Sequence, residues 1–114
     1  MSEISDIRGF IDGFHLGDTI PHMEQDLTLC IGYEQRIGEL TNQAKTDYKT
    51  KYLESLKSLS NLDDETETTR KAKLEAWTAP EEQVWQDFKL LGRSLKAIRM
   101  SLWQGIKTRR EEPI

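Results

Sequence analysis

The sequence predicts an all-α protein in which long amphipathic helices form an antiparallel helical hairpin or open bundle. Apolar residues recur at helical spacing along most of the chain, and strand-like alternation is absent. The 114 residues are 36% hydrophobic and 32% charged, which suits helices that each bury one stripe around a thin core. We therefore expect coiled-coil-like packing that is completed by formation of a homo-oligomer.

A short N-terminal helix is predicted over residues 4–16. Ile4, Ile7, Ile11 and Phe14 recur at intervals of three or four, so they lie on one face of a helix. Two glycines inside this segment each cost about 1 kcal/mol relative to alanine. Packing against the rest of the chain must therefore hold this helix in place.

A long helix is predicted over residues 21–60. Its apolar residues have a mean spacing of 3.6, the period of a straight α-helix. Thr19 is a suitable N-cap, and Pro21 falls in the first turn, where its missing N–H is harmless. Gly32 and Gly38 are weak points, and the sequence leaves open whether the helix continues through them.

The second half of the chain is predicted to hold a linker at residues 61–65, a short helix at 65–77 and a long helix at 79–108. The linker is rich in residues that favour turns and helix starts. Thr78 and Pro80 have the spacing of a cap followed by a first-turn proline, which indicates a new helix start. One helical domain over residues 1–114 accommodates all of these elements.

The last helix contains an apolar series with steps of four and three residues. Such a 3.5-residue repeat is typical of the seam between helices in left-handed packing. We expect this seam to line the core or an oligomer interface. Its members are Val84, Phe88, Leu91, Leu95, Ile98 and Leu102.

Charge is distributed unevenly along the chain. Residues 1–47 hold nine acids and three bases, whereas residues 89–110 hold seven bases and no acid. Such a basic helix can follow phosphates, and an exposed tryptophan can stack on an unpaired base. The candidate residues for contact with single-stranded nucleic acid are Lys89, Arg93, Lys96, Arg99, Trp103, Lys107, Arg109 and Arg110. The same bases could instead be solvated or meet the acidic half of this or another chain.

No catalytic residues, metal site or cofactor are predicted. Cys30 lies on the apolar stripe of the long helix, which favours simple burial. His15 and His22 lack paired-ligand spacing, and no glycine-rich phosphate loop occurs. One cysteine, no apolar run of about 20 residues and no secretory signal together predict a cytoplasmic protein without a membrane span.

The chain from about residue 48 to 110 resembles small uncharacterised helical proteins of tailed bacteriophages. The resemblance follows the order of Tyr-x-x-x-Tyr-Leu, an Asp-Asp-Glu-Thr linker, Arg-Lys-Ala-Lys-Leu-Glu-Ala and Thr-Ala-Pro-Glu-Glu before an aromatic heptad helix. Some such proteins belong to recombination and replication functions. The resemblance implies an accessory role in DNA metabolism and assigns no residues.

We therefore expect a non-enzymatic accessory protein, phage- or prophage-encoded, that contacts single-stranded nucleic acid in the host cytoplasm. One alternative is an adaptor or inhibitor that binds a host or phage protein through the acidic N-terminal half and the segment from Ile4 to Phe14. Another alternative is a structural or assembly protein.

Overall fold

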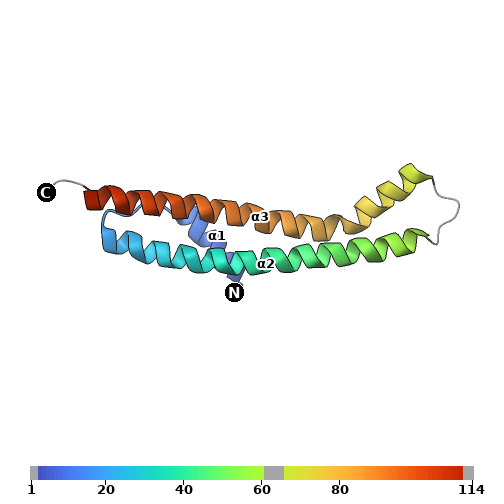
Figure 1. Ribbon diagram of the computed structural model, residues 1–114, viewed down its shortest axis with the longest axis horizontal. Helices are drawn as coiled ribbons and strands as arrows, with labels where there is room; N and C mark the ends of the chain where they lie inside the picture. Colours follow the sequence, from blue (N-terminus) through green and yellow to red (C-terminus); the bar gives the residue numbers. More distant parts are fainter. Residues whose placement is uncertain (1–2, 61–65, 112–114) are drawn as a thin grey trace. The chain divides into compact units, whose positions relative to one another are not determined.

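The computed structural model describes residues 3–60 and 66–111, and it confirms the all-α prediction. Over these residues the chain forms three helices and no strand: α1 (Glu3–Gly13), α2 (Ile20–Ser60) and α3 (Glu67–Glu111). Within each of the two compact units described below, α2 and α3 lie side by side and run in opposite directions, as an antiparallel hairpin requires (Figure 1). None of the helices in these two ranges is both long and apolar enough to cross a membrane.

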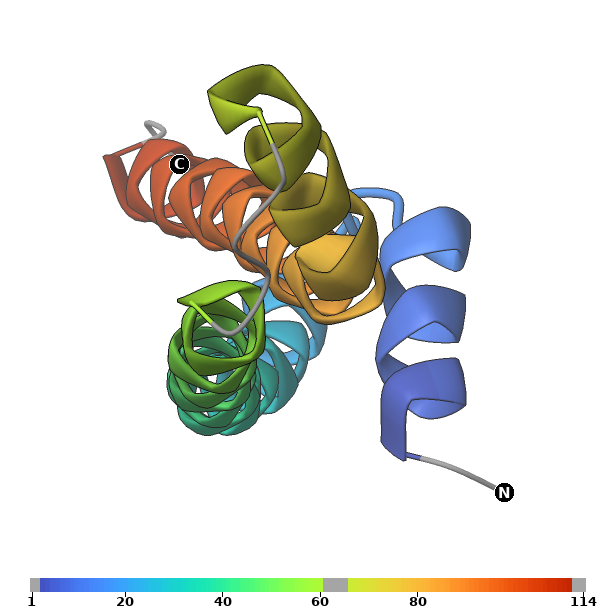
Figure 2. The same ribbon diagram turned by 90° about the vertical axis from the view of Figure 1, so that its right-hand side faces the viewer.

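The chain divides into two compact units, where the sequence predicts one domain. Unit 1 comprises Met1–Gly38 and Leu90–Ile114, and unit 2 comprises Glu39–Lys89. Unit 1 therefore contains α1, the beginning of α2 and the end of α3, which appear as blue, cyan and red ribbons in Figure 2. Unit 2 contains the end of α2 and the beginning of α3.

Helix α2 begins where the sequence predicts and has no break. The backbone N–H of His22 donates to Thr19 Oγ1 at 3.3 Å, so Thr19 caps the helix. The helix continues through Gly32 and Gly38, and no described glycine has a positive φ. A regular ladder of backbone hydrogen bonds therefore holds both glycines in helical conformation, although each lowers the helix propensity.

Helix α3 differs from the prediction of two helices with a restart near Thr78. Thr66 caps the start, accepting from the N–H of Thr69 at 3.2 Å, and one helix follows from Glu67 to Glu111. The hydroxyl of Thr78 donates to Leu74 O at 2.8 Å, within the preceding turn, and so does not cap a new helix. Pro80 lies inside the helix, which bends in its yellow part in Figure 1. The predicted linker at residues 61–65 lies outside the described residues.

Unit 1 has a continuous apolar core made by all three of its helices. Ile7 of α1 is 1% exposed, and Arg36 of α2 pairs with Glu3 of α1 through bonds of 2.6 and 3.0 Å. Phe10 meets Tyr33 edge-on, with ring centroids 5.3 Å apart. These contacts hold the glycine-containing helix α1 against α2. The other buried side chains of this core are Met23, Cys30, Ile37, Leu95, Ile98, Leu102 and Ile106.

Unit 2 has a smaller core with an aromatic contact at its centre. Tyr48 of α2 stacks on Trp85 of α3, with ring centroids 5.6 Å apart, and Ala44 and Leu59 are buried. The seam predicted from the heptad spacing places Val84 in such a core, yet Val84 is 48% exposed. The reason is the stacking of the next residue, which turns Trp85 toward α2 and leaves Val84 at the surface.

Two glycines provide a matched test of this packing. An added Cβ at Gly32 would meet nothing within 4 Å, so Gly32→Ala should raise the free energy of unfolding by about 1 kcal/mol through helix propensity. An added Cβ at Gly105 would lie 2.9 Å from Met23 Sδ and 3.2 Å from the Leu16 methyls. In Gly105→Ala this crowding should therefore cancel the free energy gained through helix propensity.

The measurement is urea denaturation followed by circular dichroism. We expect Gly105→Ala to be less stable than Gly32→Ala by at least about 1 kcal/mol. Equal stabilisation by both substitutions would contradict the close approach of α3 to Leu16 and Met23.

Candidate nucleic-acid interface

The outward face of α3 in unit 1 carries cations interleaved with an aromatic and a thioether side chain. Arg93, Lys96, Met100, Trp103 and Lys107 follow one another at steps of three, four, three and four residues, so they share one face of the helix. All five are exposed, Met100 at 53% and Trp103 at 49%. We call this set the basic stripe.

The opposite face of the same helix segment is buried. Leu95 and Leu102 are fully buried and Ile98 is 8% exposed, as members of the predicted seam. Ile106 continues the series by one further step of four, and Leu91 is half-buried. Because this seam faces the core of unit 1, the basic stripe lies on the side of the helix that faces solvent.

Arg99 lies between the seam and the basic stripe and is already engaged. Its Nε donates to Glu34 Oε1 on α2 at 2.6 Å, and the two side chains are only 20% and 25% exposed. Its guanidinium also lies over the ring of Trp103, 4.7 Å from the centroid. Arg99 therefore links the two helices and orients Trp103, whose ring remains half-exposed.

The remaining predicted cations have other surroundings. Arg110 pairs loosely with Glu24 at 3.7 Å. Lys89 belongs to unit 2, where its ammonium lies 4.7 Å from the centroid of the Trp85 ring. Arg109 lines a hollow on unit 1. Of the eight candidates, the structure thus brings Arg93, Lys96, Trp103 and Lys107 together.

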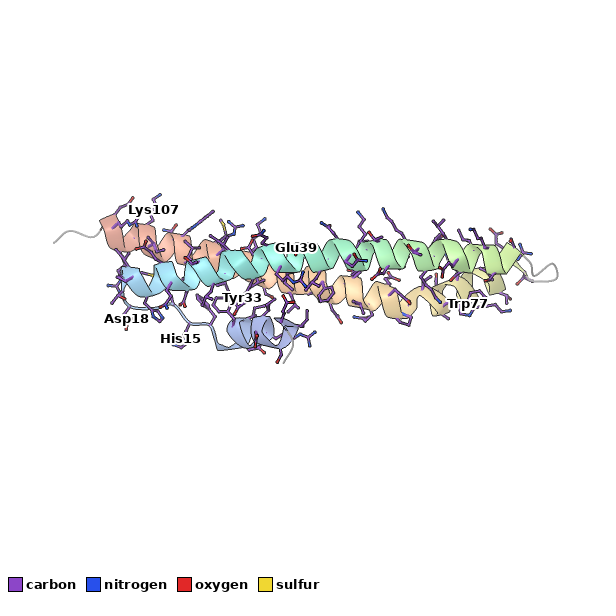
Figure 3. All side chains as sticks on the ribbon, turned by 90° about the horizontal axis from the view of Figure 1, so that it is seen from below. His15, Asp18, Tyr33, Glu39, Trp77 and Lys107 are labelled. Atoms are coloured by element: carbon purple, nitrogen blue, oxygen red, sulfur yellow. The ribbon has the colours of Figure 1, made fainter. Side chains whose placement is uncertain are left out.

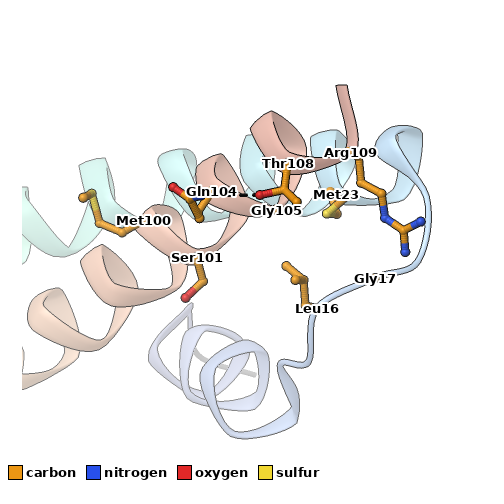
Figure 4. A pocket seen from close by; sticks show the side chains of 9 residues that line it. All are labelled: Leu16, Gly17, Met23, Met100, Ser101, Gln104, Gly105, Thr108 and Arg109. Carbon is orange, nitrogen blue, oxygen red and sulfur yellow. Dashed lines mark hydrogen bonds between the residues drawn. The ribbon is translucent and has the colours of Figure 1, made fainter. Parts of the chain in front are cut away.

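The hollow beside the basic stripe has a volume of about 640 Å³ and is mostly apolar. Leu16, Met23 and Met100 contribute to its wall, and Arg109 stands at the end near the C-terminus of α3 (Figure 4). Met100 belongs both to this wall and to the basic stripe. Met100 is absent from the residues predicted from the sequence, and the adjoining hollow is a feature of the structure.

Cys30 is a core side chain and not a nucleophile at neutral pH. It is fully buried, and its thiol donates to the carbonyl oxygen of Leu95 at 3.2 Å. Burial, and to a smaller extent the nearby Glu34 carboxylate, raises the pKa of the Cys30 thiol to about 11. The thiolate that alkylation or catalysis requires is therefore scarce.

The two histidines lie apart and near the surface. Figure 3 shows His15 in the segment between α1 and α2, where its Nδ1 is 3.2 Å from Gly13 O. His22 Nε2 lies 3.4 Å from Asp26 Oδ2, one turn away on α2. Among the residues that the structure describes, no three His, Cys, Asp or Glu side chains gather in a way that could hold a metal ion.

No protein family, curated protein or solved structure matches this chain. The chemistry of the basic stripe therefore rests on its own side chains. Exposed cations at helical spacing attract phosphates, and a half-exposed indole offers a stacking surface. Lys107, which points outward at the red end of α3 in Figure 3, extends this surface toward the C-terminal end of the helix.

The pKa of Cys30 leads to a test by alkylation. At pH 8 the thiol should react with iodoacetamide about 100-fold more slowly than in urea-unfolded protein, because a pKa about two units higher leaves that much less thiolate. In the background Cys30→Ala, a cysteine introduced by Thr50→Cys at an exposed position of α2 is the control and should react rapidly. Equal rates at Cys30 in native and unfolded protein would contradict the burial.

The same pKa predicts a loss of stability at alkaline pH. The thiol holds its proton longer in the folded state, so its contribution is complete below pH 9.0, the ordinary value, and is lost as the pH rises to about 11. The free energy of unfolding should therefore fall between these values by more in the wild type than in Cys30→Ala. If urea denaturation shows that the free energy of unfolding falls equally with pH in both proteins, the thiol has its ordinary pKa in the folded state.

The Arg99 contacts lead to a prediction about stability. Arg99→Ala would leave the half-buried Glu34 carboxylate without its cation and remove the contact with Trp103. We expect the free energy of unfolding to fall by about 1–3 kcal/mol. Arg110→Ala is the matched control, because its pair with Glu24 is 62% and 52% exposed and should contribute less than about 1 kcal/mol. If urea denaturation shows that both substitutions lower the free energy of unfolding equally, the contacts of Arg99 contribute no more than an exposed ion pair.

Proposed function

We propose that this chain is a non-enzymatic accessory protein that binds single-stranded nucleic acid along the basic stripe of α3. The observation that carries the proposal is the exposure of Arg93, Lys96 and Lys107 on the same helix face as the half-exposed Trp103. At 1.5 Å per residue the stripe is about 21 Å long, enough for a short stretch of a single strand.

The charges of the stripe are not neutralised within the described chain. Over residues 3–60 and 66–111, no acid forms an ion pair with Arg93, Lys96 or Lys107, whereas Arg99 and Arg110 pair with acids of α2. Glu34 and Glu24 of α2 thus meet cations at the edges of this face of α3. This distribution supports local attraction of phosphates by an acidic protein, because exposed charges are screened beyond about 10 Å.

Trp103 favours a single strand over a duplex. Base–aromatic stacking requires an unpaired base face, which a duplex hides between neighbouring pairs. The Arg99 guanidinium already lies over the Trp103 ring, so the ring is oriented before any base arrives. A base that stacks on the exposed part of this ring would add to the phosphate contacts of Arg93 and Lys96.

The alternative of a partner-binding N-terminal segment has less support. Ile7 is buried and Phe10 packs on Tyr33, so the apolar face of α1 is used within unit 1. An accessory role in DNA recombination or replication, in a phage or prophage setting, follows from the resemblance of residues 48–110 together with the basic stripe.

The test is a fluorescence-anisotropy titration of a labelled single-stranded oligonucleotide at roughly 50 and 200 mM salt. Three phosphate contacts predict a loss of affinity of about 20-fold between these conditions. Arg93→Glu combined with Lys96→Glu should abolish binding. Trp103→Ala should weaken binding by about 5-fold or more and leave the salt dependence unchanged.

The control is the double substitution Lys57→Glu and Lys71→Glu, which changes the net charge equally at exposed positions of unit 2. This variant should bind nearly as well as the wild type. No binding at the lower salt concentration would overturn the proposal, and so would an equal loss of affinity in the two double variants.

A further inference from the structure

A second hollow of unit 1 lies between α2 and α3, beside the basic stripe. Its volume is about 430 Å³, within the roughly 300–1,000 Å³ of small-molecule sites. Trp103 and Lys107 line this hollow and also belong to the basic stripe. Glu24 and Leu27 of α2 line it from the other helix. A strand bound along the basic stripe would therefore pass the mouth of the hollow.

The hollow adjoins the face of the Trp103 ring that Arg99 leaves uncovered. The Arg99 guanidinium reaches over the ring from the preceding turn of α3, 4.7 Å from the centroid. The described residues of α3 that line the hollow are Trp103 and residues that follow it in the chain, such as Ile106 and Lys107. Arg99 and the hollow thus lie on opposite sides of the ring, so a flat ligand can stack in the hollow without displacing Arg99.

The floor of the hollow is apolar, and its rim carries charges of both signs. Ile106 is 7% exposed and Leu27 is half-buried, so both offer apolar surface to a flat ring. The exposed side chains at the rim are Glu24 of α2 and Lys107 and Arg110 of α3. A nucleobase combines these requirements, because it is a flat ring whose edge presents hydrogen-bond donors and acceptors.

The carboxylate of Glu24 retains acceptor capacity for such a base. Its Oε2 atom lies 3.7 Å from Nη2 of Arg110, beyond the range of a hydrogen bond, and the two side chains are 52% and 62% exposed. Arg110 nevertheless offsets the charge of the carboxylate, which reduces its repulsion of a nearby phosphate. Glu24 can therefore accept hydrogen bonds from a base while the basic stripe holds the backbone of the strand.

Guanine matches this arrangement better than the other bases do. Its N1–H and N2–H donors are neighbours and suit the two oxygens of one carboxylate. Its O6 and N7 atoms are the acceptors that lysine and arginine contact most often in nucleic acids. Cytosine and adenine present an amino group beside a ring-nitrogen acceptor, and thymine presents one donor between two carbonyls. Each of these three bases would place an acceptor against the carboxylate of Glu24.

We propose that the hollow binds one unpaired guanine, stacked on Trp103, with Glu24 accepting from N1–H and N2–H and Lys107 donating to the edge that carries O6 and N7. This inference rests on the proposed function, because it names the base that the strand presents beside the basic stripe. It gives the protein a sequence preference that phosphate contacts alone do not supply.

The first experiment compares an oligothymidylate with strands that carry one guanine, adenine, cytosine or hypoxanthine at the same position. The strand with guanine should bind about 5-fold or more tighter than the oligothymidylate, the smallest effect expected of a bidentate base contact. Hypoxanthine lacks the N2 amino group and should lose most of this gain. Equal affinity for all strands, or a larger gain with adenine or cytosine, would overturn the inference and leave the proposed function standing.

Glu24→Gln tests the carboxylate. The glutamine amide donates where a carboxylate oxygen accepts, so the preference for guanine should fall below about 2-fold. Affinity for oligothymidylate should stay the same or rise, because a negative charge is removed. Glu54→Gln is the matched control, with the same change of charge at an exposed position of α2 in unit 2, and it should keep the full preference. An equal preference for guanine in both variants would contradict the role of Glu24.

A mononucleotide separates this inference from the proposed function, because it needs no contact along the basic stripe. In a proton–nitrogen NMR titration without potassium, millimolar guanosine monophosphate should shift the indole N–H resonance of Trp103, assigned with Trp103→Phe. The resonances of Trp77 and Trp85 in unit 2 should stay in place. A shift of Trp103 with the guanine nucleotide and not with thymidine monophosphate supports the hollow even if strands fail to bind. The same shift with both nucleotides, or with neither, would overturn the inference.

Discussion

The orientation of α3 about its own axis in unit 1 determines which of its side chains are buried and which face solvent. Leu95 and Leu102 have no exposed surface, and burial of two leucines contributes roughly 3–6 kcal/mol relative to their exposure. A helix with this seam turned inward has a fixed outer face, and that face holds Arg93, Lys96 and Trp103. The arrangement of the cations is therefore a consequence of core packing, and it requires no interaction among the cations themselves.

The same constraint explains how an acidic protein keeps a basic surface. Side chains at the edge of the seam, such as Arg99, come within reach of α2, and α2 supplies Glu34 as their partner. Residues on the outer face lie too far around the helix for such pairing. The carboxylates of α2 thus neutralise the cations that approach the core, where an unpaired charge would be costly, and leave the outer cations to solvent.

The sequence predicts those features that depend on local periodicity. Spacing alone predicts which stretches are helical, the Thr19 cap and the buried face around Leu95, because each of these follows from neighbours within a few residues. The restart at Thr78 is not correct, although the residues suit a cap. There the hydroxyl is satisfied by the preceding turn, so the helix continues and bends at Pro80.

Features set by contacts between distant segments could not be predicted in this way. Heptad spacing places Val84 in the seam, but Tyr48 stacks on Trp85 and selects the adjacent face. A count of charges along the sequence does not distinguish the seven bases near the C-terminal end. In the structure Arg99 is paired with Glu34, so it is not available to a ligand. Both outcomes depend on which residues of α2 lie opposite α3, and a one-dimensional pattern does not contain that information.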